Sequence, residues 1–339
     1  MRFLYGIIDE LVMYERGEVY IMKIVELDRN TLGYDIDTTV FADFGEYEQH
    51  DSDTVLNNRG FIKDADIVIF NKAVMNEEML RDAENVRLLC VTATGYDNID
   101  LDYARSRGIA VANVKAYSTP AVAQHTFALA LYVLEKISYY DDYVKSGKYS
   151  SQTGFCNFDE HFNELDGKTW GIVGMGNIGR SVAKIAAAFG CRVIYYSTTG
   201  KNKVDGFKQV SFDELLTQSD VLSLHCPLND NTRGLIDMAA LKKMKSSAIL
   251  INVARGPVIV DEDLTQALEQ GIIAGAGLDV LTKEPMTKDN PLHRIKDSRK
   301  LIITPHMAWA SVEARQRCVD EIYLNIKAFL NGESRNRVD

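Results

Sequence analysis

The sequence lacks the features that mark membrane proteins and nucleic-acid-binding proteins. Its 339 residues contain no stretch of 18 uninterrupted apolar residues, so we expect no membrane-spanning segment. The formal net charge of −10 repels phosphates, which argues against a nucleic-acid partner. With 46% hydrophobic and 25% charged residues, the chain has instead the composition of a globular protein.

Cysteine pairs of the kind that hold metals are also absent. The five cysteines are scattered, at Cys90, Cys156, Cys191, Cys226 and Cys318. They form no CxxC pair and no cysteine–histidine spacing of a zinc site. We therefore expect reduced thiols, a cytoplasmic location and no bound metal.

The N-terminus lacks the pattern of a secretion signal, because residues 1–21 carry Asp9, Glu10 and Glu15 where a signal needs an apolar core. At Met22 the run MKIVEL reads as the first buried strand of an α/β domain. We therefore treat residues 1–21 as an extension, and whether the protein starts at Met1 or at Met22 stays open.

Short apolar, β-rich runs alternate with helical patterns, which predicts parallel sheets built from right-handed βαβ units. The length favours two such domains with a cleft between them. We expect strands of the first domain at 23–27, 37–42, 66–70, 88–93 and 110–114. A second series of six strands runs from KTWGIV at Lys168 to LIITP at 301–305, which fits a complete dinucleotide-binding sheet.

Several helix boundaries carry their own signals. Ser211 and Glu214 form a capping-box pattern, and Asp261 is expected to cap a helix that Gly271 ends. Two more helices are expected at about 119–136 and 311–330. The last of these is amphipathic and is expected to fold back on the first domain, whereas the acidic stretch 46–53 reads as a solvated loop.

A glycine-rich turn, GMGNIG, directly follows the strand TWGIV and precedes a helical pattern. In that position Gly174 suits a tight turn, Gly176 a close approach to a pyrophosphate, and Gly179 the packing of helix against strand. The helix beginning near Asn177 would offer free N–H groups to that pyrophosphate. The alternative is a glycine turn that only packs.

The acid that usually binds the ribose hydroxyls of NAD is missing, because Ser197 stands at its place after the strand RVIYY. Without it a 2′-phosphate meets no repulsion, and Ser197, Thr198 and Thr199, with Lys201 and Lys203, could bind one. Alternatively, the hydroxyls simply bind the ribose of NAD. Both NAD and NADP stay open as cofactors.

Three candidate catalytic residues follow three successive strands: Arg255 after AILINVA, Glu284 after AGLDV and His306 after LIITP. Each alone has an ordinary reading, as a surface arginine, an exposed glutamate or a loop histidine. Their shared placement beyond the carboxyl ends of one sheet, where ligands bind, makes them candidates together.

These residue types suit the reduction of a 2-keto acid. His306 can protonate the carbonyl oxygen, and a neighbouring Glu284 would favour the charged imidazole and fix its orientation. Arg255 can bind the substrate carboxylate. Exposed N–H groups in the turn at Thr94 and Gly95 suggest a second carboxylate contact, although that turn needs no ligand to form.

Over nearly all of residues 22–335 the chain resembles the D-2-hydroxyacid dehydrogenases. The matching segments are ATGYDNID (93–100), AVAQHTFALAL (121–131), GIVGMGNIG (171–179), HCPLNDNTRGLI (225–236), INVARGPVIVDEDL (251–264), GLDVLTKEP (277–285) and TPHMAWAS (304–311). The resemblance is greatest to glycerate dehydrogenases, which are hydroxypyruvate reductases. Gln124 departs from a glutamate common in the family, and Ser197 departs from the usual acid.

The resemblance implies an α/β fold of two Rossmann-like domains. A six-stranded NAD(P)-binding domain would span 118–307, and a smaller flavodoxin-like substrate domain would comprise 22–117 and 308–335. Arg255, Glu284 and His306 would carry the catalytic roles, with Thr94 and Gly95 on the substrate carboxylate. Positions that would line the dinucleotide are Asn177, Ile178, Cys226, Pro227, Thr232, Val253 and Asp279.

The function implied is hydride transfer from NAD(P)H to hydroxypyruvate or glyoxylate, giving D-glycerate or glycolate, in a homodimer. A lactate-type dehydrogenase, a phosphite-oxidising enzyme and a cofactor-gated corepressor-like binding protein remain alternatives. Formate dehydrogenases pair their histidine with glutamine, so Glu284 speaks against that activity.

Overall fold

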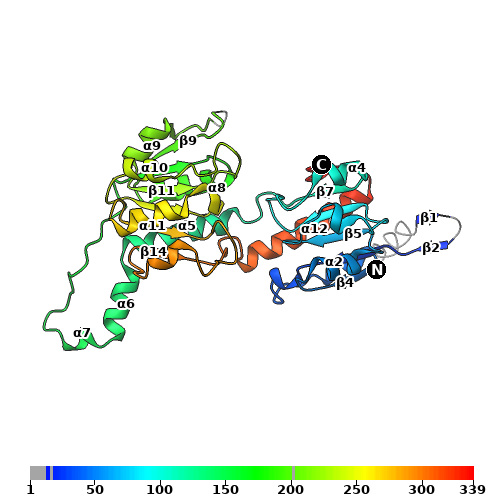
Figure 1. Cartoon of the computed structure of the whole chain (residues 1–339), viewed down its shortest axis with the longest axis horizontal. Coiled ribbons are helices and arrows are strands. Elements are labelled where there is room, and N and C mark those ends of the chain that lie inside the picture. The colour runs from blue at the N-terminus through cyan, green and yellow to red at the C-terminus, as the bar shows by residue number, and fades with distance from the viewer. Residues whose placement is uncertain (1–12, 16–17, 201–202) are drawn as a thin grey trace. The chain divides into compact units, whose positions relative to one another are not determined.

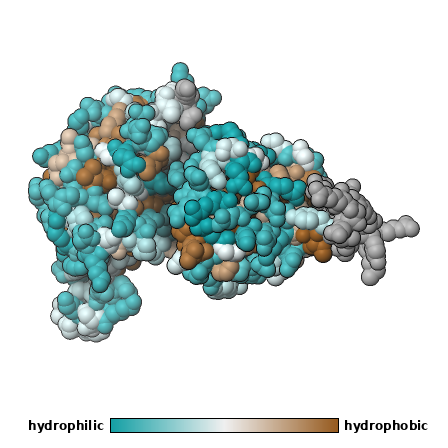
Figure 2. Space-filling model, turned by 45° about the vertical axis from the view of Figure 1, so that its right-hand side comes forward, coloured by the Kyte–Doolittle hydropathy of each residue, from teal (hydrophilic) through white to brown (hydrophobic). Residues whose placement is uncertain are grey.

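The computed structural model describes residues 13–15, 18–200 and 203–339, so most of the 1–21 extension and Lys201 lie outside the described residues. The chain divides into two compact units, which are described separately. The first unit ends at Ser118 and resumes at Ala310–Asp339, and the second is Thr119–Trp309. No described helix is long and apolar enough to cross a membrane, and the face drawn in Figure 2 is mainly hydrophilic.

The first unit is built on a five-stranded parallel sheet in the order β4-β3-β5-β6-β7. Its strands are β3 (Lys23–Glu26), β4 (Glu46–Gln49), β5 (Ile67–Phe70), β6 (Leu88–Val91) and β7 (Ala110–Ala112). Its helices are α2 (Val55–Ile62), α3 (Glu77–Leu80), α4 (Leu101–Ser106) and α12 (Val312–Leu330), with 3₁₀ turns η1 (Arg29–Thr31) and η2 (Thr39–Phe44). An antiparallel pair, β1 (Met13–Glu15) and β2 (Glu18–Tyr20), precedes the sheet.

The strand predicted at 37–42 is wrong, because η2 occupies Thr39–Phe44 and the strand β4 follows it. Phe41 and Phe44 are both buried, and three residues per turn place them on one side of a 3₁₀ helix. At Gly45, with φ 150°, a Cβ would lie 2.2 Å from the Met22 carbonyl oxygen. The chain can therefore turn into β4 only through glycine, and part of the predicted acidic loop becomes an edge strand.

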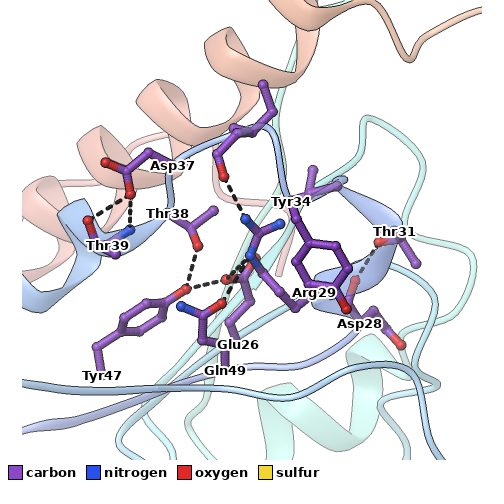
Figure 3. Close-up of polar contacts among 12 residues, drawn as sticks. Glu26, Asp28, Arg29, Thr31, Tyr34, Asp37, Thr38, Thr39, Tyr47 and Gln49 are labelled. Carbon is purple, nitrogen blue, oxygen red and sulfur yellow. Dashed lines mark hydrogen bonds and ion pairs between the residues drawn. The ribbon is translucent and has the colours of Figure 1, made fainter.

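A buried polar cluster ties β3, β4 and the segment between them together (Figure 3). Arg29 donates to the carbonyl oxygens of Gly33 and Ile36, at 3.0 and 2.5 Å. The Tyr47 hydroxyl contacts the Glu26 carboxylate and lies 2.8 Å from Thr38 Oγ1. Burial raises the pKa of Glu26 above its usual range, although Tyr47 and Arg29 oppose the shift.

The second unit contains a seven-stranded parallel sheet in the order β10-β9-β8-β11-β12-β13-β14. The strands are β8 (Thr169–Val173), β9 (Arg192–Tyr196), β10 (Lys208–Gln209), β11 (Val221–Leu224), β12 (Ile249–Asn252), β13 (Gly275–Leu278) and β14 (Leu301–Ile303). The six predicted strands are present, and the two-residue β10 adds an edge strand. The strand order reverses around β8, which is the usual place for a ligand at the carboxyl ends of such a sheet.

The helices of the second unit cover this sheet, and α6 and α7 extend away from it (Figure 1). They are α5 (Thr119–Leu134), α6 (Ile137–Lys145), α7 (Lys148–Ser151), α8 (Asn177–Ala188), α9 (Phe212–Gln218), α10 (Met238–Lys243) and α11 (Asp261–Glu269), with 3₁₀ turns η3 (Gly256–Val258) and η4 (Pro291–Arg294). Apolar clusters on the sheet include Trp170 and Ile251 in one and Leu222 and Leu250 in the other.

Two capping predictions have different outcomes. The capping box of Ser211 and Glu214 is present at the start of α9. The predicted cap by Asp261 is wrong, because Val260 occupies the cap position of α11. The Asp261 carboxylate instead accepts hydrogen bonds from Thr282 and Asn290, at 3.1 and 3.0 Å, and so ties the start of α11 to the segment after β13.

Candidate active site

The glycine turn after β8 has a steric reason at two of its positions. Gly174 has φ 91°, and a Cβ there would lie 2.8 Å from the Cys226 backbone nitrogen. A Cβ on Gly179 would lie 2.2 Å from the Gly174 carbonyl oxygen, so α8 packs directly against the turn. A Cβ on Gly176 would meet nothing within 4 Å, so this position faces open space.

Gly176 is also the cap residue of α8, and no side chain caps that helix. The first-turn N–H groups therefore remain available to an anion, as a dinucleotide pyrophosphate requires. Asn177 begins the helix, with its Oδ1 accepting from Arg180 at 2.7 Å, and Ile178 is half-buried. The open space at Gly176 and the uncapped helix fit a bound dinucleotide.

Ser197, the position predicted to contact the ribose of the dinucleotide, directly follows β9. Ser197 is 5% exposed, and its hydroxyl has no hydrogen-bond partner among the described residues. Lys203 is exposed on the segment that follows. A buried hydroxyl without a partner fits a position that completes its hydrogen bonding with a ligand.

The remaining predicted dinucleotide positions differ in how free their side chains are. Cys226 and Val253 are buried, and Pro227 is exposed. The Thr232 hydroxyl donates to the Pro227 carbonyl oxygen at 2.7 Å and accepts from the Asn229 N–H at 2.8 Å. Thr232 therefore shapes its own loop.

Close backbone contact joins the loops that carry the predicted catalytic residues. A Cβ on Gly256 would lie 1.9 Å from the Leu281 carbonyl carbon, so only glycine lets the loop after β12 touch the loop after β13. Arg255 immediately precedes this contact. Its backbone oxygen accepts from Asn252 at 3.0 Å, and its Nη1 donates to the Ala254 oxygen at 2.8 Å.

His306 and Glu284 form a direct pair. The imidazole Nδ1 lies 2.7 Å from Glu284 Oε2, while Glu284 Oε1 accepts from the Leu281 N–H at 2.9 Å. The side chains are 28% and 35% exposed, so a substrate can reach the pair. His306 has φ 56°, a conformation that residues with side chains rarely adopt, and such positions are concentrated at functional sites.

Asp279 directly follows β13 and is 1% exposed. Its carboxylate accepts from the N–H groups of Met307 and Ala308, at 2.7 and 2.8 Å. Burial raises its pKa, but hydrogen bonds from His125, Thr304 and these N–H groups outweigh burial and lower the pKa overall. Neither His125 nor Thr304 is among the site residues predicted from the sequence.

Thr94 and Gly95 belong to the first unit. The Thr94 hydroxyl donates to the Val114 oxygen at 2.8 Å, so the side chain is used within the fold. In the described part of the chain, the backbone N–H groups of Thr94 and Gly95 donate to no other residue. Such groups are suited to an anion.

No group of three or more histidine, cysteine, aspartate or glutamate side chains is placed to hold a metal ion within the described ranges. The five cysteines, all in those ranges, are free thiols. The fold and site instead define an oxidoreductase that uses a dinucleotide, with a histidine–carboxylate pair at the carboxyl edge of its nucleotide-binding sheet.

Residues 127–308 match the family model described as D-isomer specific 2-hydroxyacid dehydrogenase, NAD binding domain. Hydroxypyruvate reductase of Blautia hydrogenotrophica is 40% identical over 325 residues, covering 94% of this chain and all of the relative. Glycerate dehydrogenase of Methylorubrum extorquens is 37% identical over 318 residues, covering 94% of this chain and 99% of the relative.

Solved structures agree with these matches. An acyclic imino acid reductase in complex with NADPH and D-Arg has a TM-score of 0.84 at 32% identity, over 94% of this chain and all of that chain. D-lactate dehydrogenase from Aquifex aeolicus, complexed with NAD and lactic acid, has a TM-score of 0.79 at 29% identity, over 91% and 96%.

The chain belongs to the D-isomer specific 2-hydroxyacid dehydrogenase family. It is an oxidoreductase that transfers a hydride between a nicotinamide dinucleotide and a small 2-keto acid, giving a 2-hydroxy acid.

Proposed function

We propose that the chain reduces hydroxypyruvate and glyoxylate to D-glycerate and glycolate. The observation that carries the proposal is the contact between His306, in the loop after β14, and Glu284, in the loop after β13. His306 Nδ1 lies 2.7 Å from Glu284 Oε2. The names of the two relatives, hydroxypyruvate reductase and glycerate dehydrogenase, support this substrate class.

The proposed mechanism assigns a role to each of these residues. Glu284 holds Nδ1 of His306, so Nε2 is the nitrogen that faces the substrate and gives its proton to the carbonyl oxygen. Arg255 binds the substrate carboxylate and polarises the carbonyl group. A bound reduced nicotinamide supplies the hydride. Thr94 and Gly95 add backbone N–H groups to the carboxylate.

The dinucleotide is held, in this proposal, by the glycine turn and the start of α8 at its pyrophosphate and by Ser197 at its ribose. The other lining positions are Asn177, Ile178, Cys226, Pro227, Thr232, Val253 and Asp279. In this proposal the dinucleotide-binding domain comprises residues 118–307, and the substrate domain comprises residues 22–117 and 308–335.

Both NADH and NADPH serve as cofactor in this proposal. No carboxylate stands at Ser197 to repel a 2′-phosphate, and the Ser197 hydroxyl has no partner among the described residues. Ser197→Asp should weaken NADPH binding about tenfold or more, the equivalent of ~1.4 kcal/mol of repulsion, and spare NADH. Titration of each cofactor onto the protein measures this. Equal losses for both cofactors would contradict a role at the 2′ position.

The activity test uses hydroxypyruvate, glyoxylate, pyruvate and phosphoglycerate, each with NADH and with NADPH. Oxidation of the cofactor is followed by absorbance. We expect the first two acids to be reduced with the highest kcat/KM. Binding of a cofactor without turnover of any acid would refute the proposal and favour a corepressor-like binding protein.

Two variants test the assigned roles. His306→Asn should lower kcat about 100-fold or more while cofactor affinity stays near that of the wild type, because the lost step is proton transfer. Arg255→Lys should raise KM for the keto acid, because an ammonium group cannot reproduce a two-pronged contact. A normal kcat in His306→Asn, or a normal KM in Arg255→Lys, would remove that residue from the mechanism.

A homodimer is the proposed assembly, with a second copy covering the segment after α7. Phe155, Phe158 and Phe162 are 87%, 80% and 51% exposed there, an unusual density of apolar surface. Light scattering should give twice the chain mass, and Phe155→Ser with Phe158→Ser should give the monomer. An unchanged mass in the double variant would point to another interface.

The free cysteines support the proposed cytoplasmic location.

A further inference from the structure

The packing of α5 against β13 follows a regular register. This register determines which residue of α5 lies beside Asp279, whose carbonyl oxygen accepts a hydrogen bond from the His306 N–H. A Cβ on Gly275 would lie 2.5 Å from Val133 Cγ1, and a Cβ on Gly277 would lie 2.9 Å from the Leu129 Cβ. Alternate residues of the strand thus meet every fourth residue of the helix, and the two elements run in opposite directions. Continued by one step, this register brings Asp279 to His125.

The next contact in the register is polar. His125 Nε2 lies 2.9 Å from Thr304 Oγ1 and 3.4 Å from Asp279 Oδ1. The Thr304 hydroxyl donates to Asp279 Oδ1 at 2.6 Å. Since the only hydroxyl proton of Thr304 is used on Asp279, its lone pair accepts from His125, which therefore carries a proton on Nε2.

Asp279 in turn accepts hydrogen bonds from the backbone around His306. Its carboxylate accepts from the N–H groups of Met307 and Ala308, and its carbonyl oxygen accepts from the His306 N–H at 2.8 Å. These bonds fall on His306 and the two residues after it, and His306 has φ 56°, a backbone conformation that is unfavourable for residues with a side chain. That conformation directs Nδ1 to Glu284.

We propose that His125 and Thr304 are positioning residues: together they fix the Asp279 carboxylate, which holds the left-handed backbone that aims the His306 imidazole at Glu284. The inference rests on the proposed catalytic role of His306. It assigns to α5, through His125, a part in the alignment of the proton donor.

The test removes one group at a time with a conservative partner for each. Thr304→Val keeps the shape and loses the hydroxyl, whereas Thr304→Ser keeps it. His125→Leu loses the donor, whereas His125→Gln keeps an amide N–H close to the place of Nε2. Thr265→Val is a matched control. It removes a buried hydroxyl from α11 whose hydrogen bond, within the described structure, goes to the backbone oxygen of Asp261.

Thr304→Val and His125→Leu should lower kcat about 10- to 100-fold, because a misaligned proton donor loses that much, with the NADH dissociation constant changed less than about threefold. Thr304→Ser and His125→Gln should restore most of kcat, and Thr265→Val should leave it unchanged. Thermal unfolding of each variant checks that it is folded.

A measurement independent of activity is the NMR signal of the His306 Nδ1 proton, identified by its loss in His306→Asn. In Thr304→Val this signal should shift or exchange faster with solvent, and in Thr265→Val it should not. A kcat within twofold of wild type in folded Thr304→Val, or a cofactor affinity that falls as much as kcat, would overturn the inference. Full activity of His306→Asn would instead refute the proposed function.

Discussion

Lowering the pH from 7 to 5 should weaken the second unit through one histidine. His225 directly follows β11, and its Nε2 lies 3.0 Å from Ser223 Oγ. Its Nδ1 is buried and has no hydrogen-bond partner in the described structure. Burial therefore lowers the pKa of His225 from 6.5 to about 3.

The sign and the size follow from these two values. Between pH 6.5 and pH 3 the unfolded chain binds a proton that the folded chain does not, so stability is kept above that window and falls as the pH falls through it. One pKa unit corresponds to about 1.4 kcal/mol. At pH 5, about 1.5 units below the unfolded value, the loss relative to pH 7 is about 2 kcal/mol.

His225→Gln isolates this contribution, because the amide can keep the contact with Ser223 and does not titrate. The two tryptophans, Trp170 and Trp309, both lie in the second unit, so their fluorescence reports its unfolding by urea. The free energy of unfolding of the variant, minus that of the wild type, should rise by about 2 kcal/mol from pH 7 to pH 5. A difference that is the same at both pH values would refute the reasoning, whatever its size.

Three further substitutions test buried contacts inside the units, two in the first unit and one in the second. Glu26→Gln should gain stability relative to wild type as the pH rises above the ordinary range of glutamate, because burial raises the pKa of Glu26 and its ionised form destabilises the folded protein. Urea unfolding at pH 5 and pH 8 measures the difference in free energy of unfolding, and the opposite trend would contradict this account. Gly277→Ala should cost about 1–3 kcal/mol by pushing α5 from β13, seen as a lower urea midpoint; a neutral result would mean that the helix shifts freely. Gly45→Ala should speed hydrogen exchange of the Glu46 amide, which bonds to the Met22 oxygen, and unchanged protection there would argue against the steric account.

Features that depend on local patterns could be predicted from the sequence. Six of the seven strands of the second unit follow from apolar runs, and the capping box at Ser211 follows from its spacing. The pairing of His306 with Glu284 follows from their shared position after neighbouring strands, since the carboxyl ends of parallel strands meet at one edge.

Features that depend on contacts between distant residues could not be predicted in the same way. TVFADF is rich in apolar residues and suggests a strand, but burial of Phe41 and Phe44 on one side and the contact of Gly45 with Met22 favour a 3₁₀ turn. His125 lies within the helix that the sequence predicts at about 119–136. Its link to Asp279 becomes visible only when the glycines of β13 are matched to α5.

Because the backbone of Gly256 touches the Leu281–Thr282 peptide, the loops after β12 and β13 can change in length or path only together. A deletion or insertion in either loop would displace the proposed carboxylate anchor and the partner of the proposed proton donor together. Chimaeras with other dehydrogenases should therefore exchange both loops at once, since a single transplanted loop would have to fit a neighbour whose main chain it touches.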